Sequence, residues 1–147
     1  MWSSDLVLFG ALTLLLIVAG TQDWSSREVS NWITIPLFVA GLIACVWRIF
    51  TDPLNGFAVA IMILLLTAAI WKKDWMGGAD WKVLVGLFGL WPLAGIVSLA
   101  ATGIYGAAEI IRTRNWRTRI PAVSVIAVAV TLTFFIVVFR ITPIIKV

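Results

Sequence analysis

Two aspartates, Asp23 and Asp80, are the residues of this chain most able to do chemistry. Asp23 lies in GTQDWSSREVSN and Asp80 in WMGGADWKVLVG, each at the edge of a long apolar run. When two carboxylates share a site, their repulsion lets one stay protonated as a general acid while the other acts as a base on water. Such a pair can hydrolyse a peptide bond. The two aspartates therefore predict a hydrolytic site, provided that the fold brings them together.

Each aspartate also has a purely structural interpretation. Asp80 follows Gly77 and Gly78, which allow a close approach of the backbone to another group, and it stands where a carboxylate would cap the start of a helix. Asp23 is compatible with an ordinary position in a loop. The sequence by itself leaves both interpretations open for both residues.

Other chemistries are excluded by the residues that the chain lacks. It contains no histidine, which rules out Ser-His and Cys-His nucleophile pairs and the histidine-based zinc motifs. Its single cysteine, Cys45, lies inside an apolar run, where we expect it to be a small packing residue. We expect no metal and no cofactor. The net charge of +4 needs no acidic partner, so no nucleic-acid partner is expected.

The composition indicates a membrane protein. Of 147 residues, 62% are apolar and only 12% are charged, which is too little polar surface for a soluble domain. Several apolar stretches approach the length that spans a bilayer. The first stretch begins with the acidic segment MWSSD and has no small-residue cleavage site after it, so it is read as a true span and not as a signal peptide. We expect one all-α, polytopic membrane domain over residues 1–147.

Breaker residues divide this domain into six helical segments, of which the fourth is short. A turn is expected at TDPLNG, residues 51–56, and a break at Pro92, because a single helix over 81–112 would be about 48 Å long. The predicted segments are 5–21, 33–50, 57–71, 81–91, 93–111 and 121–140.

The basic residues give this arrangement an orientation. With the N-terminus outside, eight of the eleven lysines and arginines lie on the inner side and three on the outer side, as the positive-inside rule requires. The inner set is Arg27, Lys72, Lys73, Lys82, Arg112, Arg114, Arg117 and Arg119, and the outer set is Arg48, Arg140 and Lys146. Asp23 and Asp80 both then lie at the inner surface, at the end of the first segment and the start of the fourth.

At these two stretches the chain resembles the type IV prepilin peptidases, the intramembrane aspartyl proteases with a G-x-G-D motif. The first family motif is an aspartate followed eight residues later by an asparagine or aspartate, which matches Asp23 and Asn31 in DWSSREVSNWITIPL. The second is a glycine-rich aspartate followed by x-Lys, which matches Asp80 and Lys82 in GGADWKVLVGLFG. The late stretch RIPAVSVIAVA, residues 119–129, is similar to the proline-led final helix of the family.

Three features resemble the short members of the family, such as the peptidases of tight-adherence pilus systems. The glycine before the second aspartate is replaced by Ala79, and the common proline before the asparagine is replaced by Ser30. The paired CxxC segment of the bifunctional, N-methylating enzymes cannot be formed with one cysteine. The resemblance therefore implies a peptidase without methyltransferase activity.

The resemblance also implies a substrate and a location. The substrate would be the precursor of a pilin-like subunit, with a short basic leader, a glycine and an apolar helix, cleaved after the glycine at the cytoplasmic surface of the inner membrane. Asp23 and Asp80 would be catalytic, with Asn31, Lys82, Gly77 and Gly78 in support. For Asn31 and Lys82, a helix cap and an interface anchor are equally good interpretations.

Three alternatives remain at this point. A non-enzymatic carrier or a pilus or secretion assembly subunit would also carry carboxylates in the membrane, although no inverted repeat is visible and both aspartates lie at one surface. A presenilin-like protease would act on other membrane helices. An archaeal preflagellin peptidase is a related form of the main hypothesis. The sequence gives no indication of the oligomeric state.

Overall fold

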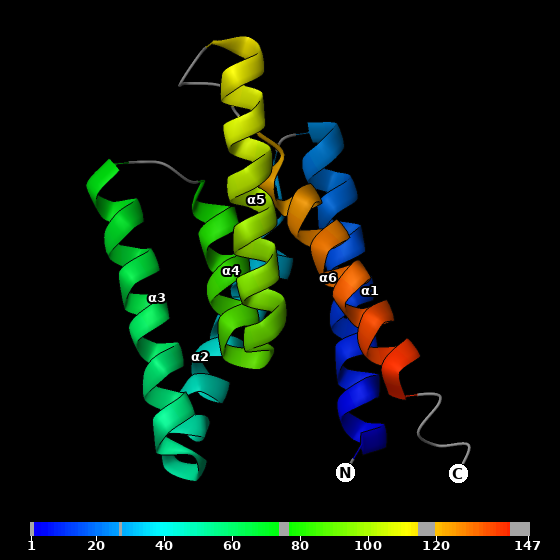
Figure 1. Ribbon diagram of the computed structural model, residues 1–147, viewed down its shortest axis with the longest axis vertical. Coiled ribbons are helices and arrows are strands. Elements are labelled where there is room, and N and C mark those ends of the chain that lie inside the picture. Colours follow the sequence, from blue (N-terminus) through cyan, green and yellow to red (C-terminus); the bar gives the residue numbers. More distant parts are fainter. Residues whose placement is uncertain (1, 27, 74–76, 115–119, 142–147) are drawn as a thin grey trace. The chain divides into compact units, whose positions relative to one another are not determined.

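The structure, a computed structural model, describes residues 2–26, 28–73, 77–114 and 120–141, and over these residues the regular structure is entirely helical. Figure 1 shows the six helices in chain order. The expected all-α fold with a short fourth helix is confirmed. The helices are α1 (Trp2–Ser26), α2 (Asn31–Thr51), α3 (Pro53–Lys73), α4 (Gly78–Leu90), α5 (Pro92–Thr113) and α6 (Ala122–Ile141).

The predicted break at Pro92 is confirmed, since α4 ends at Leu90 and Pro92 is the first residue of α5. The first turn of a helix tolerates proline because its missing N–H would have no partner there. The predicted end of the first helix, at residue 21, is too early, because α1 continues to Ser26. Ser25 and Ser26 continue α1, and their hydroxyls donate to the carbonyls of Thr21 (3.0 Å) and Gln22 (2.8 Å). Asp23 therefore lies inside the last turns of α1.

The predicted turn over 51–56 is wrong. Only Asp52 separates α2 from α3, and Pro53 already belongs to the helix. The Asp52 side chain accepts a hydrogen bond from the backbone N–H of Asn55 at 3.4 Å, and so caps the start of α3. Gly56 is a packing residue and not a breaker, because a Cβ there would lie 2.5 Å from the Cα of Ile49 in α2.

The helices group into two compact units. One consists of residues 1–27 and 97–147, and the other of residues 28–96, so the division falls within α5. Several residues of the charge argument, among them Arg27, Arg117, Arg119 and Lys146, lie outside the described residues.

In the first unit, α1 and α6 lie side by side and run antiparallel (Figure 1). The register follows from three contacts: the side chain of Asp23 reaches Ser124, Gly20 faces Ala127, and Gly10 faces Phe134. At Gly20 the two helices approach so closely that a Cβ would lie 2.8 Å from the Cβ of Ala127. Small residues allow this kind of contact between membrane helices, where van der Waals packing drives association.

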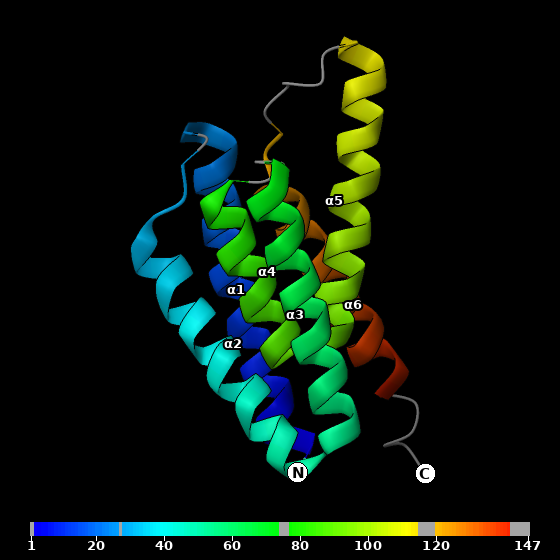
Figure 2. The ribbon, with the colours of Figure 1, turned by 90° about the vertical axis from the view of Figure 1, so that its left-hand side faces the viewer.

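In the second unit, α4 packs in parallel with α2 and antiparallel to α3 (Figure 2). Seven successive residues of α4, Val83 to Gly89, are buried. Glycines make this possible, since a Cβ on Gly86 would lie 2.7 Å from the carbonyl oxygen of Leu37, and one on Gly89 would collide with the backbone of Gly41. The parallel packing brings the starts of α2 and α4 to the same end of the unit.

Four of the described helices, within α1, α2, α5 and α6, are long and apolar enough to cross a membrane, and α3 has a shorter apolar stretch over Pro53–Ala68. The chain is thus a multi-pass membrane protein. With 13 residues, α4 is about 20 Å long and falls short of a hydrocarbon core of about 30 Å.

Candidate active site

Asp80 occupies the first turn of α4, three residues after the N-cap residue Gly77. Its Oδ2 accepts a hydrogen bond from the backbone N–H of Gly77 at 3.2 Å, and the carbonyl of Gly77 accepts the first helical N–H, that of Trp81, at 3.2 Å. A carboxylate in this position stabilises the helix start and interacts favourably with its partial positive charge. The structural interpretation of Asp80 is thus realised, and the side chain is held at the end of a helix.

The two glycines before Asp80 make room in different ways. Gly77 has φ −64° and ψ 150°, which any residue can adopt, but a Cβ there would lie 3.0 Å from the Oδ2 of Asp80. At Gly78 a Cβ would meet nothing within 4 Å. Gly77 therefore gives space to the carboxylate itself, whereas Gly78 leaves an open approach to the first turn of α4.

Asn31 and Lys82, 51 positions apart, are hydrogen-bonded to each other. The Nζ of Lys82 donates to the Oδ1 of Asn31 at 3.1 Å. Asn31 is the first residue of α2, and the preceding Ser30 caps that helix by accepting the N–H of Trp32 at 3.3 Å. Lys82 thus ties the start of α4, two residues after Asp80, to the start of α2.

Trp81 ties the same turn to α3. Its Nε1–H donates to the Oγ1 of Thr67 at 3.2 Å, and its ring lies 5.0 Å, between centroids, from the ring of Phe38 in α2. Contacts from Trp81 and Lys82 therefore orient the turn that carries Asp80 against both neighbouring helices.

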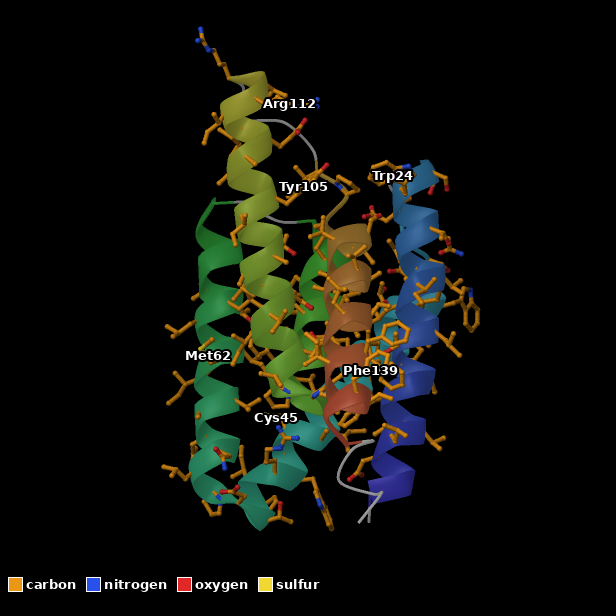
Figure 3. All side chains as sticks on the ribbon, turned by 45° about the vertical axis from the view of Figure 1, so that its right-hand side comes forward. Trp24, Cys45, Met62, Tyr105, Arg112 and Phe139 are labelled. Carbon is orange, nitrogen blue, oxygen red and sulfur yellow. The ribbon has the colours of Figure 1, made fainter. Side chains whose placement is uncertain are left out.

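Asp23 lies in the other unit, near the end of α1, with only 6% of its surface exposed. Its Oδ2 accepts a hydrogen bond from the backbone N–H of Ser124 at 3.1 Å and lies 3.3 Å from the hydroxyl of the same residue. Ser124 is the third residue of α6. By contrast, the next residue in the chain, Trp24, is 67% exposed and projects from the end of α1 (Figure 3).

Ser124 was not singled out from the sequence as a site residue. The stretch that contains it, RIPAVSV, is recognisable as a helix start with a serine in its first turn. Its pairing with a carboxylate 101 positions earlier is visible only in the fold.

The structure brings together five of the six residues predicted for the site. Gly77, Gly78, Asp80, Lys82 and Asn31 all belong to the second unit, at the end where α2 and α4 begin. Asp23 belongs to the first unit, at the end where α1 finishes and α6 begins. Within the part of the chain that the structure describes, no three acidic or cysteine side chains gather as metal ligands would.

Two other carboxylates have structural partners. Asp52 caps α3, as described above. Glu109 is bound by Arg112, one turn later on α5, whose Nη2 and Nε donate to the two carboxylate oxygens at 2.6 and 3.0 Å. Figure 3 shows Arg112 near the end of α5. The pairing of Glu109 with a basic neighbour agrees with a structural role.

Comparison with known proteins decides the family. The sequence profile of the type IV leader peptidase family matches residues 10–142, which include Asp23, Asp80 and Ser124. The chain belongs to the type IV leader peptidase family. A similar protein is the preflagellin peptidase of Methanococcus voltae, 33% identical over 85 residues, which cover 52% of this chain and 35% of that protein. No solved structure matches the chain.

Proposed function

We propose that this member of the type IV leader peptidase family is a membrane-embedded aspartic endopeptidase, and that Asp23 and Asp80 are its acid and base. The observation that carries the proposal is the family match over residues 10–142, a range that contains both aspartates. Membership of a peptidase family favours this function over a carrier or an assembly subunit.

The reaction needs two carboxylates and one water molecule. One aspartate, ionised, takes a proton from water as the oxygen attacks the carbonyl carbon of the scissile bond. The other, protonated, gives its proton to the leaving nitrogen as the C–N bond breaks. The products are a free carboxylate on the leader and a free amine on the mature chain, and the proton returns from one aspartate to the other through solvent.

The substrate is the precursor of a pilin-like or preflagellin-like subunit, with a short basic leader and a glycine before an apolar helix. Its apolar helix would lie in the bilayer and present the cleavage point at the inner membrane surface, with the N-terminus of the enzyme outside. The open space beside Gly78 suits the approach of an extended substrate backbone. Lys82 and Asn31 hold the turn of Asp80 in place by their hydrogen bond.

Isosteric amide variants test the two catalytic roles. We expect Asp23→Asn and Asp80→Asn each to abolish removal of the leader from a co-expressed precursor, measured by its shift on a gel, while both variants accumulate in the membrane. Asp5→Asn and Asp52→Asn are the controls and should process the precursor normally. Full processing by either Asp23→Asn or Asp80→Asn would overturn the proposal.

Cross-linking tests whether the two positions meet. In a Cys45→Ala background, the double variant Asp23→Cys, Asp80→Cys should form an internal cross-link with a short bis-maleimide, detected by mobility on a gel after proteolytic cleavage between the two positions. The pair Asp5→Cys, Asp80→Cys is the control and should not cross-link. No cross-link in the first pair, with both thiols reactive toward a monofunctional maleimide, would count against a shared catalytic water.

A further inference from the structure

The carboxylate of Asp23 is held by one residue of α6. Oδ2 of Asp23 accepts the backbone N–H of Ser124 at 3.1 Å and lies 3.3 Å from its Oγ, while the same hydroxyl donates to the carbonyl oxygen of Gly20 at 2.7 Å. Oδ1 of Asp23 has no hydrogen-bond partner among the described residues. Among the residues that the structure describes, one oxygen of the carboxylate is therefore anchored and the other is left available.

The N–H of Ser124 is free to serve Asp23 because of how α6 begins. The first helical hydrogen bond of α6 runs from the N–H of Val125 to the carbonyl of Pro121, at 3.2 Å. The N–H of Ser124, one residue earlier, has no partner within the helix, as is general for the first turn. This end of a helix carries partial positive charge, which attracts a carboxylate. Asp23, which is buried, takes up a donor that would otherwise be unsatisfied.

Ser124 can serve Asp23 in either protonation state. A hydroxyl has one proton to donate and two lone pairs to accept with. While Asp23 is protonated on Oδ1, the hydroxyl keeps its proton on the carbonyl of Gly20, and the backbone N–H of Ser124 alone holds Oδ2. When Asp23 is ionised, rotation of the hydroxyl turns the proton toward Oδ2. An acid or base that changes its proton during catalysis needs a partner of this kind.

The packing of α1 against α6 limits the movement of this contact. A Cβ on Gly20 would lie 2.8 Å from the Cβ of Ala127 and 3.3 Å from the Cα of Ser124. The helices are thus in contact at Gly20, and the carbonyl of Gly20 is presented directly to Ser124. Asp23, three residues further along α1, is held in the same register.

We propose that Ser124 is a positioning residue whose hydroxyl, in addition to its backbone N–H, is needed to anchor Oδ2 of Asp23 and thereby to direct Oδ1 toward the attacking water. The proposal rests on the proposed function, because it gives Asp23 a catalytic role. Ser124 acts through Asp23 and has no contact of its own with the reacting atoms. It should therefore affect the rate of the chemical step and leave substrate binding unchanged.

Three variants of purified enzyme in detergent micelles, assayed with a synthetic precursor, test this role. Ser124→Ala should lower kcat by about 10-fold to 100-fold, the range expected for a hydrogen bond to a charged group, with KM changed less than about threefold. Ser124→Thr, which retains the hydroxyl, should recover most of kcat. Thr131→Val is the matched control and should keep kcat, since the hydroxyl of Thr131 bonds only within α6, to the carbonyl of Ala127 at 2.7 Å.

The outcomes separate the two proposals. If Asp23→Asn is inactive while Ser124→Ala retains full kcat, or raises KM alone, the role of Ser124 is wrong and the proposed function stands. If Asp23→Asn is active, the proposed function itself is wrong. Should Ser124→Ala fail to accumulate, Ser124→Cys replaces it, because a thiol of similar size is a weak donor. A folded Ser124→Cys variant with full kcat would also overturn the proposal.

Discussion

Lys82 and Asn31 join the starts of two parallel helices by a single hydrogen bond of 3.1 Å between Nζ and Oδ1. Both residues match the family motifs in sequence, but each motif by itself assigns them no common purpose. The bond connects the second residue after Asp80 with the first residue of α2. Asn31 is thus placed to act on Asp80 indirectly, through the position of Lys82.

Removing either partner of this bond should lower activity. We expect Lys82→Met and Asn31→Leu each to reduce leader removal about 10-fold, because a hydrogen bond to a charged group contributes about 1.5–3 kcal/mol and the first turn of α4 loses its tie to α2. The double variant should be no slower than the worse single variant. Initial rates of precursor cleavage by the two single variants and the double variant measure the coupling. If the double variant lost activity by the product of the two single losses, the two residues would act separately.

Asn31→Asp is the informative control for this pair. It keeps an acceptor oxygen for Lys82 and replaces a neutral acceptor with a charged one, which makes an ion pair, so it should retain most of the activity. A loss as large as that of Asn31→Leu would mean that the amide group of Asn31 is needed for something other than accepting the bond from Lys82.

Much of this arrangement could be predicted from local features of the sequence. Pro92 separates α4 from α5 because proline is favoured in the first turn of a helix and removes a hydrogen bond from a helix interior. Helix capping by Asp80 was one of the two interpretations that the sequence left open, and the structure shows it. These predictions succeed because they depend on a few neighbouring residues.

Features that depend on contacts between distant residues could not be predicted in this way. Gly56 is surrounded by turn-forming residues, yet its role is set by the backbone of Ile49 on another helix. At the end of α1, the hydroxyls of Ser25 and Ser26 bond back to helical carbonyls, a choice that serines make only in some settings. No local pattern in the sequence identifies Ser124 as a partner of Asp23, because the two residues are 101 positions apart.

Because α2 packs closely against α4, we expect two glycine-to-alanine variants to differ in stability. Gly86→Ala should destabilise the protein by about 1–3 kcal/mol, since its methyl group would press on the carbonyl of Leu37 at 2.7 Å. At Gly103 in α5 a methyl group meets nothing within 4 Å, so Gly103→Ala should be neutral or slightly stabilising. Thermal unfolding in detergent compares them, and equal midpoints for the two variants would contradict the packing described.

The indole of Trp81 predicts a coupled pair with Thr67. Trp81→Phe removes the N–H donor and keeps an aromatic ring near Phe38, and Thr67→Val removes the acceptor. Each should cost about 1 kcal/mol of stability, and the double variant should cost less than the sum of the two. Trp32→Phe is the control, since Trp32 is 90% exposed. Strict additivity in a thermal unfolding cycle would show that this hydrogen bond does not form.

The orientation of the chain in the membrane can be tested with single cysteines in a Cys45→Ala background. Leu54→Cys lies at the start of α3, where Leu54 is 83% exposed, and Ser25→Cys lies at the exposed end of α1. With the N-terminus outside, as the charge distribution predicts, a membrane-impermeant maleimide should label Leu54→Cys in intact spheroplasts. Ser25→Cys should be labelled only after permeabilisation. The Cys45→Ala parent should remain unlabelled throughout. If Ser25→Cys were labelled in intact spheroplasts and Leu54→Cys only after permeabilisation, the helix ends that carry Asp23 and Asp80 would face away from the cytoplasm. Cleavage of a cytoplasmic leader would then be ruled out.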